Sequence, residues 1–166
     1  MVKVESQINI DDLTTLLISA SRMLAAFAAL KPFEGTNIGL AEWVALTILE
    51  KNGAVSSKQL SRIMGVTRLR SNQLLGSLSK EELATIREAT DDRRSTAEVS
   101  PKGQEHLKVV NSELQQFLGK ALEGREETLA SASRRFHLLI RLIDTVAQRP
   151  PAEGTAYAAS VARLHR

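Results

Sequence analysis

The sequence predicts a mainly α-helical protein with one small β-hairpin. Leu and Ala are abundant among the 166 residues, whereas aromatic residues make up only 4%, and a composition rich in helix formers favours helices. Apolar residues recur in alternating steps of three and four along most of the chain, which is the period of an amphipathic helix. Between residues 84 and 99 the pattern changes to two short strands separated by a polar turn.

Composition excludes several classes of protein. The chain is 43% hydrophobic and 25% charged, as is usual for one globular domain with extensions. It has no Cys, which excludes disulfides and Cys-based zinc sites and is consistent with the reducing cytoplasm, where we expect the protein. The longest apolar stretch, residues 13–30, is interrupted by polar side chains, so we expect no membrane span.

Residues 9–30 predict a first long helix, with Asn9 as its N-cap. One apolar seam runs from Ile10 to Phe27 in steps of three and four, and a second passes through Leu16, Met23 and Leu30. Two seams imply two buried faces. One face can pack on the protein's own core, and the other fits a second copy of the chain.

Residues 40–51 predict a second helix, followed by a short extended piece at residues 54–55. Ser56 then begins a third helix, because the pair Ser56 and Gln59 has the spacing of a capping box. After a sharp turn at Gly65, Thr67 caps a fourth helix that runs to about Lys80. Helix, short glycine-containing turn and helix together are typical of a helix-turn-helix.

The strands at residues 84–88 and 96–99 form a predicted hairpin whose polar tip is residues 90–94. Ser100 and Pro101 then begin a further helix, as an N-cap followed by Pro in the first turn. Apolar periodicity continues over residues 102–124 and 125–147, and Gly124 marks a break between these two helices.

Charge is concentrated in one block of the chain. Residues 51–80 contain six Lys or Arg and no Asp or Glu, and therefore carry +6, while the remaining 136 residues carry −3. Such a block fits a surface that binds a polyanion. A solvated basic face is the alternative interpretation.

A helix-turn-helix followed by a hairpin is a winged helix, and its second helix suits the major groove of B-DNA. Arg68 and Arg70 can donate to guanine or phosphate, and the amides of Asn72 and Gln73 suit adenine. Arg93 and Arg94 lie at the hairpin tip, within reach of a minor groove. The full set of predicted DNA-contacting residues is Ser56, Ser57, Gln59, Thr67, Arg68, Arg70, Ser71, Asn72, Gln73, Arg93 and Arg94.

At these positions the sequence resembles the multiple-antibiotic-resistance regulator (MarR) family of bacterial transcription factors. The resemblance covers about residues 10–147, and its matching pieces are residues 40–46, 57–67, 92–95 and 101–103. The Asp92-Arg93-Arg94 wing tip is the most specific of them. Two features depart from the family: Glu81-Glu82-Leu83 stands where a Gly usually precedes the first wing strand, and residues 92–103 are one residue short.

The resemblance implies a cytoplasmic, nucleoid-associated homodimer on a pseudo-palindromic operator. Residues 1–35 would form an N-terminal dimerisation helix, residues 36–100 the DNA-binding lobe, residues 101–148 C-terminal dimerisation helices and residues 149–166 a flexible tail. The family further implies a repressor released by a small aromatic or acidic effector, for which Arg22, Met23 and Trp43 are the candidate contacts. Core or dimer contacts are an equally good interpretation of these three residues.

The sequence contains no catalytic set, phosphate loop or dinucleotide fingerprint, and its three His have no ligand-spaced partners. We therefore predict no enzyme activity, no metal site and no cofactor. The alternative function is a winged helix that serves as a protein–protein interaction module without a specific DNA site. Against it stands the acid-free block, which such a module does not require.

Overall fold

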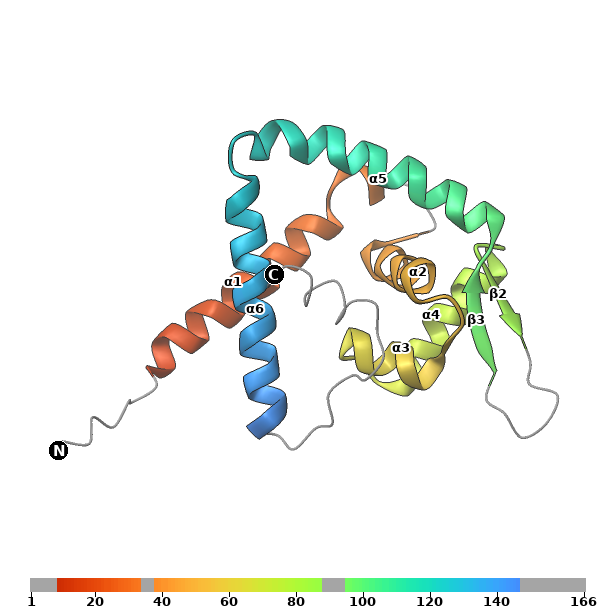
Figure 1. Cartoon of the computed structure of the whole chain (residues 1–166), viewed down its shortest axis with the longest axis horizontal. Coiled ribbons are helices and arrows are strands. Elements are labelled where there is room, and N and C mark those ends of the chain that lie inside the picture. Colours follow the sequence, from red (N-terminus) through yellow and green to blue (C-terminus); the bar gives the residue numbers. More distant parts are fainter. Residues whose placement is uncertain (1–8, 34–37, 88–94, 147–166) are drawn as a thin grey trace, which may run out of the picture. The chain divides into compact units, whose positions relative to one another are not determined.

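The computed structural model describes residues 9–33, 38–87 and 95–146. It confirms the predicted fold class, because helices dominate and one small antiparallel sheet interrupts them (Figure 1). The elements are α1 (Ile10–Ala28), η1 (Lys31–Phe33), α2 (Leu40–Asn52), β1 (Val55–Ser56), α3 (Ser57–Met64), α4 (Arg68–Lys80), β2 (Ala84–Arg87), β3 (Thr96–Val99), α5 (Pro101–Leu122) and α6 (Glu126–Val146). Met1–Leu40 and Ala41–Arg166 are two separate compact units.

Four helices begin at the N-caps that the sequence predicts. The Asn9 side chain accepts a hydrogen bond from the backbone N–H of Asp11, and the side chains of Thr67 and Ser100 accept from Arg70 and Gly103. Ser56 and Gln59 form the complete capping box of α3. Each cap pairs with a backbone N–H group that the helix itself leaves without a partner. Because the two residues are close in the sequence, the start of a helix can be predicted from the sequence nearby.

The predicted hairpin is present but belongs to a three-stranded sheet with the order β1-β3-β2. Ala84 pairs with Val99 and Arg87 with Thr96 in the hairpin, while Val55 of β1 pairs with Ala97 on the other side of β3. The sequence predicted an extended piece at residues 54–55 without this pairing. This pairing joins the segment that precedes α3 to the hairpin of β2 and β3, which we call the wing.

The core of the second unit lies among α2, α3, α4, α5 and the sheet. Its fully buried large side chains come from four helices and are Leu46, Leu49, Leu60, Leu74, Leu78 and Leu107. α4 lies against β2, and α5 follows directly on β3 (Figure 1). The orientation of α4 is therefore fixed by the same core on which α2, α3, α5 and the sheet pack.

The junction between α4 and β2 contains Glu82, in the segment where the resemblance implies a Gly. Glu82 has the left-handed conformation, with a φ of 61°. The backbone N–H of Leu83 donates to the carbonyl oxygen of Leu78 at 2.8 Å, and that of Glu82 donates to Ser79 at 3.0 Å. This is a Schellman motif, which ends a helix with a left-handed residue and favours Gly at that position.

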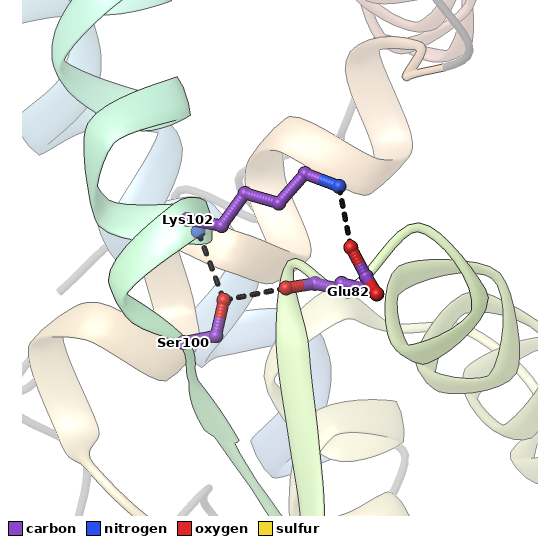
Figure 2. Close-up of polar contacts among 4 residues, drawn as sticks. Glu82, Ser100 and Lys102 are labelled. Carbon is purple, nitrogen blue, oxygen red and sulfur yellow. Dashed lines mark hydrogen bonds and ion pairs between the residues drawn. The ribbon is translucent and has the colours of Figure 1, made fainter.

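Contacts from the start of α5 hold this junction (Figure 2). The Ser100 hydroxyl donates to the backbone carbonyl oxygen of Glu82 at 2.6 Å, and Lys102 Nζ lies 2.9 Å from Glu82 Oε2. The hydrogen bond from Lys102, together with its positive charge, lowers the pKa of the Glu82 carboxyl group from its usual value of 4.5. The end of α4, the wing and the start of α5 thus meet at one point.

The long helices leave much apolar surface exposed. No residue of α1 is buried, and its two predicted seams are at most partly covered, at residues such as Leu13, Leu16 and Phe27. Large apolar side chains that are more than half exposed also occur on α5 and α6, among them Val109, Phe117, Leu129, Leu138, Ile140, Leu142 and Ile143. Among the described residues, no helix has the length and apolarity that crossing a membrane requires.

Candidate nucleic-acid interface

The turn between α3 and α4 fixes the start of the candidate recognition helix. Gly65 ends α3 with a φ of 67°, a left-handed conformation that glycine adopts without steric cost. The backbone N–H of Val66 donates to Ser61 at 3.1 Å, and Thr67 Oγ1 accepts from Arg70 N at 3.2 Å. These local bonds close α3 and begin α4 within three residues.

The inner face of α4 is Ser71, Leu74, Leu75 and Leu78, all of which are buried. Ser71 is 0% exposed, and its hydroxyl donates to the carbonyl oxygen of Ser57 at 2.9 Å. The prediction that Ser71 contacts DNA is therefore wrong. A serine on this face can be buried because its one donor has a backbone partner on α3.

The outer face of α4 presents polar and charged side chains together with one apolar one. Arg68, Arg70, Asn72 and Gln73 are all exposed, in agreement with a contact surface. Leu69 is 69% exposed and lies among them. Sequence reasoning did not single out Leu69 as a contact residue. The helical period is the signal that could have found it, because position 69 lies opposite the centre of the buried set at about 100° per residue.

The residues at the start of α3 divide into buried and accessible ones. Ser56 is 8% exposed, and its hydroxyl accepts from Gln59 N at 3.3 Å and donates to Gln59 Oε1 at 2.8 Å. The capping box thus engages the Ser56 hydroxyl within α3, and the phosphate contact of Ser56 remains a prediction. Ser57 is partly exposed and Gln59 is exposed, so both remain candidates.

Within the part of the chain that the structure describes, the basic side chains of the helix-turn-helix form no ion pair with an acidic side chain. The ion pairs in the described part of the chain are Arg87–Glu98, Lys102–Glu82, Lys108–Glu105 and Arg134–Glu127. None of them uses a cation of residues 51–80, the block that carries +6. Its charge is therefore not neutralised by neighbouring carboxylates, which favours attraction of an anionic partner.

The wing continues the surface beyond α4. Arg87 Nη2 lies 2.9 Å from Glu98 Oε2, so the two strands are joined by an ion pair across the hairpin. This pair is largely exposed and contributes little stability. The tip, with Arg93 and Arg94, lies outside the described residues, and their predicted minor-groove contacts remain a prediction. Residues 149–166, the predicted tail, lie outside them as well.

The three candidate effector contacts lie on two units. Arg22 and Met23 are exposed residues of α1, whereas Trp43 is a partly buried residue of α2. Trp43 Nε1 donates to Asn111 Oδ1 at 2.9 Å, so the indole joins α2 to α5. This bond gives Trp43 a structural role, and effector binding by the three residues remains a prediction. Within the described residues, no cluster of three or more His, Asp or Glu is arranged to hold a metal ion.

Several solved structures of transcriptional regulators of the MarR family share this architecture. A MarR/EmrR family regulator from Acinetobacter sp. ADP1 matches with a TM-score of 0.65 and 24% identity, over 85% of this chain and 99% of that one. BpsR from Bordetella bronchiseptica, whose DNA binding is regulated by 6-hydroxynicotinic acid, matches with a TM-score of 0.64 and 17% identity, over 80% and 99%. MarR from Staphylococcus aureus, solved with salicylate and kanamycin, matches with a TM-score of 0.62 and 15% identity, over 84% and 93%.

No protein-family model and no curated protein matches the sequence. The structural likeness extends over almost the full length of each of these regulators. It confirms the resemblance at the level of the fold: this chain has the fold of MarR-family transcriptional regulators.

Proposed function

We propose that this protein is a regulator of transcription that binds a specific double-stranded DNA site as a homodimer. In this proposal it acts in the bacterial cytoplasm as a repressor, and a small aromatic or acidic effector releases it from a pseudo-palindromic operator. Its DNA-binding lobe is the region from α2 to β3, and its dimerisation helices are α1, α5 and α6.

The outer face of α4 is the observation on which the proposal depends. This helix is held by a buried inner face, and its outer face presents the amides of Asn72 and Gln73 between the unpaired guanidinium groups of Arg68 and Arg70. A major groove is about 12 Å wide and admits one α-helix. Amides can read adenine, while arginines can bind guanine or phosphate.

The surrounding groups suit the sugar–phosphate backbone. Thr67 and Ser57 lie at the starts of α4 and α3, where backbone N–H groups face outward and the helix dipole favours anions. Lys58 and Arg62 on α3 add positive charge next to them. In the proposed complex these residues set the position of the lobe on the duplex, and α4 supplies the sequence preference.

Exposed apolar surface supports the homodimer. Leu17 and Leu24 on α1 are 59% and 58% exposed, Phe117 on α5 54% and Leu138 on α6 60%. Large apolar side chains exposed along long helices are typical of an interface between chains. A two-fold dimer presents two α4 helices, which requires two half-sites about 34–36 Å apart.

Regulation by an effector is supported by similarity to two of the solved structures. The DNA binding of BpsR is regulated by 6-hydroxynicotinic acid, and the S. aureus regulator was solved with salicylate. A ligand changes DNA affinity only if it binds the two conformations of the dimer unequally. Trp43 is the sole Trp of the chain, so its fluorescence reports such binding directly in titrations with these two acids.

Selection of bound sites from a random duplex pool tests the proposed function. The expected product is an inverted repeat, bound with nanomolar-range affinity that falls steeply with salt. Replacing Arg68 and Arg70 with Ala should reduce the salt slope by about 2, and Asn72→Ala or Gln73→Ala should relax preference at individual base pairs.

Lys108→Ala is the matched control, because it removes one positive charge from α5, outside the surface proposed to contact DNA. It should leave both affinity and salt slope nearly unchanged. Recovery of no enriched sequence, or equal losses from Lys108→Ala and from the α4 variants, would contradict the proposed function. The chain would then fit a protein–protein interaction module.

A further inference from the structure

Leu69 occupies the centre of the outward face of α4. The buried residues Ser71, Leu74, Leu75 and Leu78 define the inner face, and successive residues of a helix are separated by about 100°. Position 69 therefore points away from the core, with Asn72 and Gln73 as its neighbours three and four residues later. Gly76, one further turn along this ridge, has open space around it.

Folding does not account for this leucine. Its side chain is 69% exposed, the highest value among the large apolar side chains that the structure describes. Single exposed leucines are common on protein surfaces, but the other exposed leucines of the described residues lie on α1 and α6. Within residues 51–80, Leu69 is the one described large apolar side chain in this exposed class, and it stands between two unpaired arginines.

Base-pair edges offer one apolar group in the major groove, the C5-methyl of thymine. Phosphates and the minor groove offer none. We propose that Leu69 is a specificity-determining residue that packs on a thymine methyl in each half-site. The inference rests on the proposed function and deepens it, because the amides beside Leu69 suit adenine. The centre of the α4 footprint would then be an A·T-containing step.

Replacing thymine with deoxyuridine tests the contact without changing base pairing, since uracil lacks only the methyl group. The probe is the duplex obtained by site selection, with its thymines replaced one symmetric pair at a time, and binding is measured by fluorescence anisotropy. At one pair of positions the unaltered protein should lose affinity about fourfold per half-site, which corresponds to one methyl-sized group returned to water. Leu69→Ala should bind the thymine duplex more weakly and show no uracil penalty at that pair.

Two variants serve as controls. Asn72→Ala should keep the uracil penalty, because it removes a neighbouring polar contact and leaves Leu69 in place. Ile86→Ala removes an exposed apolar side chain of the wing that is 42% exposed and should also keep the penalty. Because Leu69 has little buried surface, Leu69→Ala should melt at nearly the same temperature as the unaltered protein.

The possible failures are distinguishable. Specific binding with no uracil penalty at any position, or a Leu69→Ala variant that retains the full penalty, would overturn the role of Leu69 and leave the proposed function intact. Absence of any selected site would overturn both. Unchanged duplex affinity of Leu69→Ala would also exclude the thymine contact and point to a protein partner on this face.

Discussion

Gly103 allows the first turn of α5 to cross the backbone of Leu83 at close range. A Cβ atom at this position would overlap the Leu83 carbonyl oxygen and lie 3.0 Å from Val99 Cγ2. The backbone N–H of Ser100 donates to that same carbonyl at 2.9 Å, so the backbone cannot withdraw without breaking a hydrogen bond. The Gly in the Pro101-Lys102-Gly103 piece is therefore required by packing.

Gly103→Ala should lower the free energy of unfolding by about 1–3 kcal/mol, the usual range for an overpacked site. Denaturant unfolding measures this loss. Gly119→Ala is the control on the same helix, where nothing lies within 4 Å. It should raise stability by about 0.5–1 kcal/mol, because Ala is the better helix former. Equal effects of the two substitutions would disprove the close-approach explanation.

Glu82 keeps a left-handed conformation that suits glycine better. Glu82→Gly should therefore raise the melting temperature by about 2–4 °C, since a left-handed non-glycine residue is strained. Glu81→Gly is the control, because Glu81 has a φ of −82° and gains nothing from glycine. Thermal melts compare the two. A Glu82→Gly variant that melts at a lower temperature would show that the side-chain contacts of Glu82 outweigh the strain.

The pair of Glu82 and Lys102 also predicts a pH dependence. Because Lys102 lowers the pKa of Glu82 below its usual value of 4.5, the unfolded chain takes up this proton first as the pH falls. The stabilisation is complete above pH 4.5 and is lost as the pH falls through the lower folded value. Thermal melts of the unaltered protein and of Glu82→Gln should differ slightly well above pH 4.5 and converge as the pH falls below that value. If the difference in melting temperature between the two proteins grew as the pH fell, the Lys102–Glu82 pair would not be its cause.

At the scale of the element, α4 has one face that serves stability and an opposite face to which we assign the proposed recognition of DNA. Ser71→Ala removes the buried hydrogen bond to Ser57 and should lower the free energy of unfolding by about 1 kcal/mol, with base preference unchanged. Asn72→Ala should leave stability nearly unchanged and relax base preference, since Asn72 is exposed. Unfolding curves and repeated site selection measure both properties. Relaxed preference in Ser71→Ala alone would reverse this assignment of faces.

The sequence alone predicts most helices and strands and part of the candidate nucleic-acid interface. The features that it predicts depend on contacts between residues close in the chain, whereas those that it misses depend on contacts between distant residues. The caps at Asn9, Ser56, Thr67 and Ser100 involve partners within three residues, so their patterns are visible in the chain. The pairing of Val55 with Ala97 and the contact of Ser71 with Ser57 join residues 42 and 14 positions apart, and no local pattern encodes them. The outward position of Leu69 could be predicted from periodicity, because Leu74, Leu75 and Leu78 recur at helical spacing and define the inner face.

At the scale of the whole molecule, the proposed two-fold arrangement depends on apolar faces that the single chain leaves exposed. Phe117 on α5 is 54% exposed, and a carboxylate within an apolar interface loses hydration without gaining a partner. Phe117→Asp should therefore shift the protein towards monomers in sedimentation experiments. It should also weaken operator binding strongly, because one lobe alone engages a single half-site.

Gln116→Asp is the control for charge, since Gln116 is an exposed polar neighbour of Phe117 on α5 and should preserve the dimer. A duplex that carries one half-site separates assembly from recognition. Phe117→Asp should bind it about as well as the unaltered protein does, because α4 and the wing are unchanged. If Phe117→Asp stayed dimeric, or if it lost the single half-site as well, the apolar face of α5 would not be the element that pairs the two lobes.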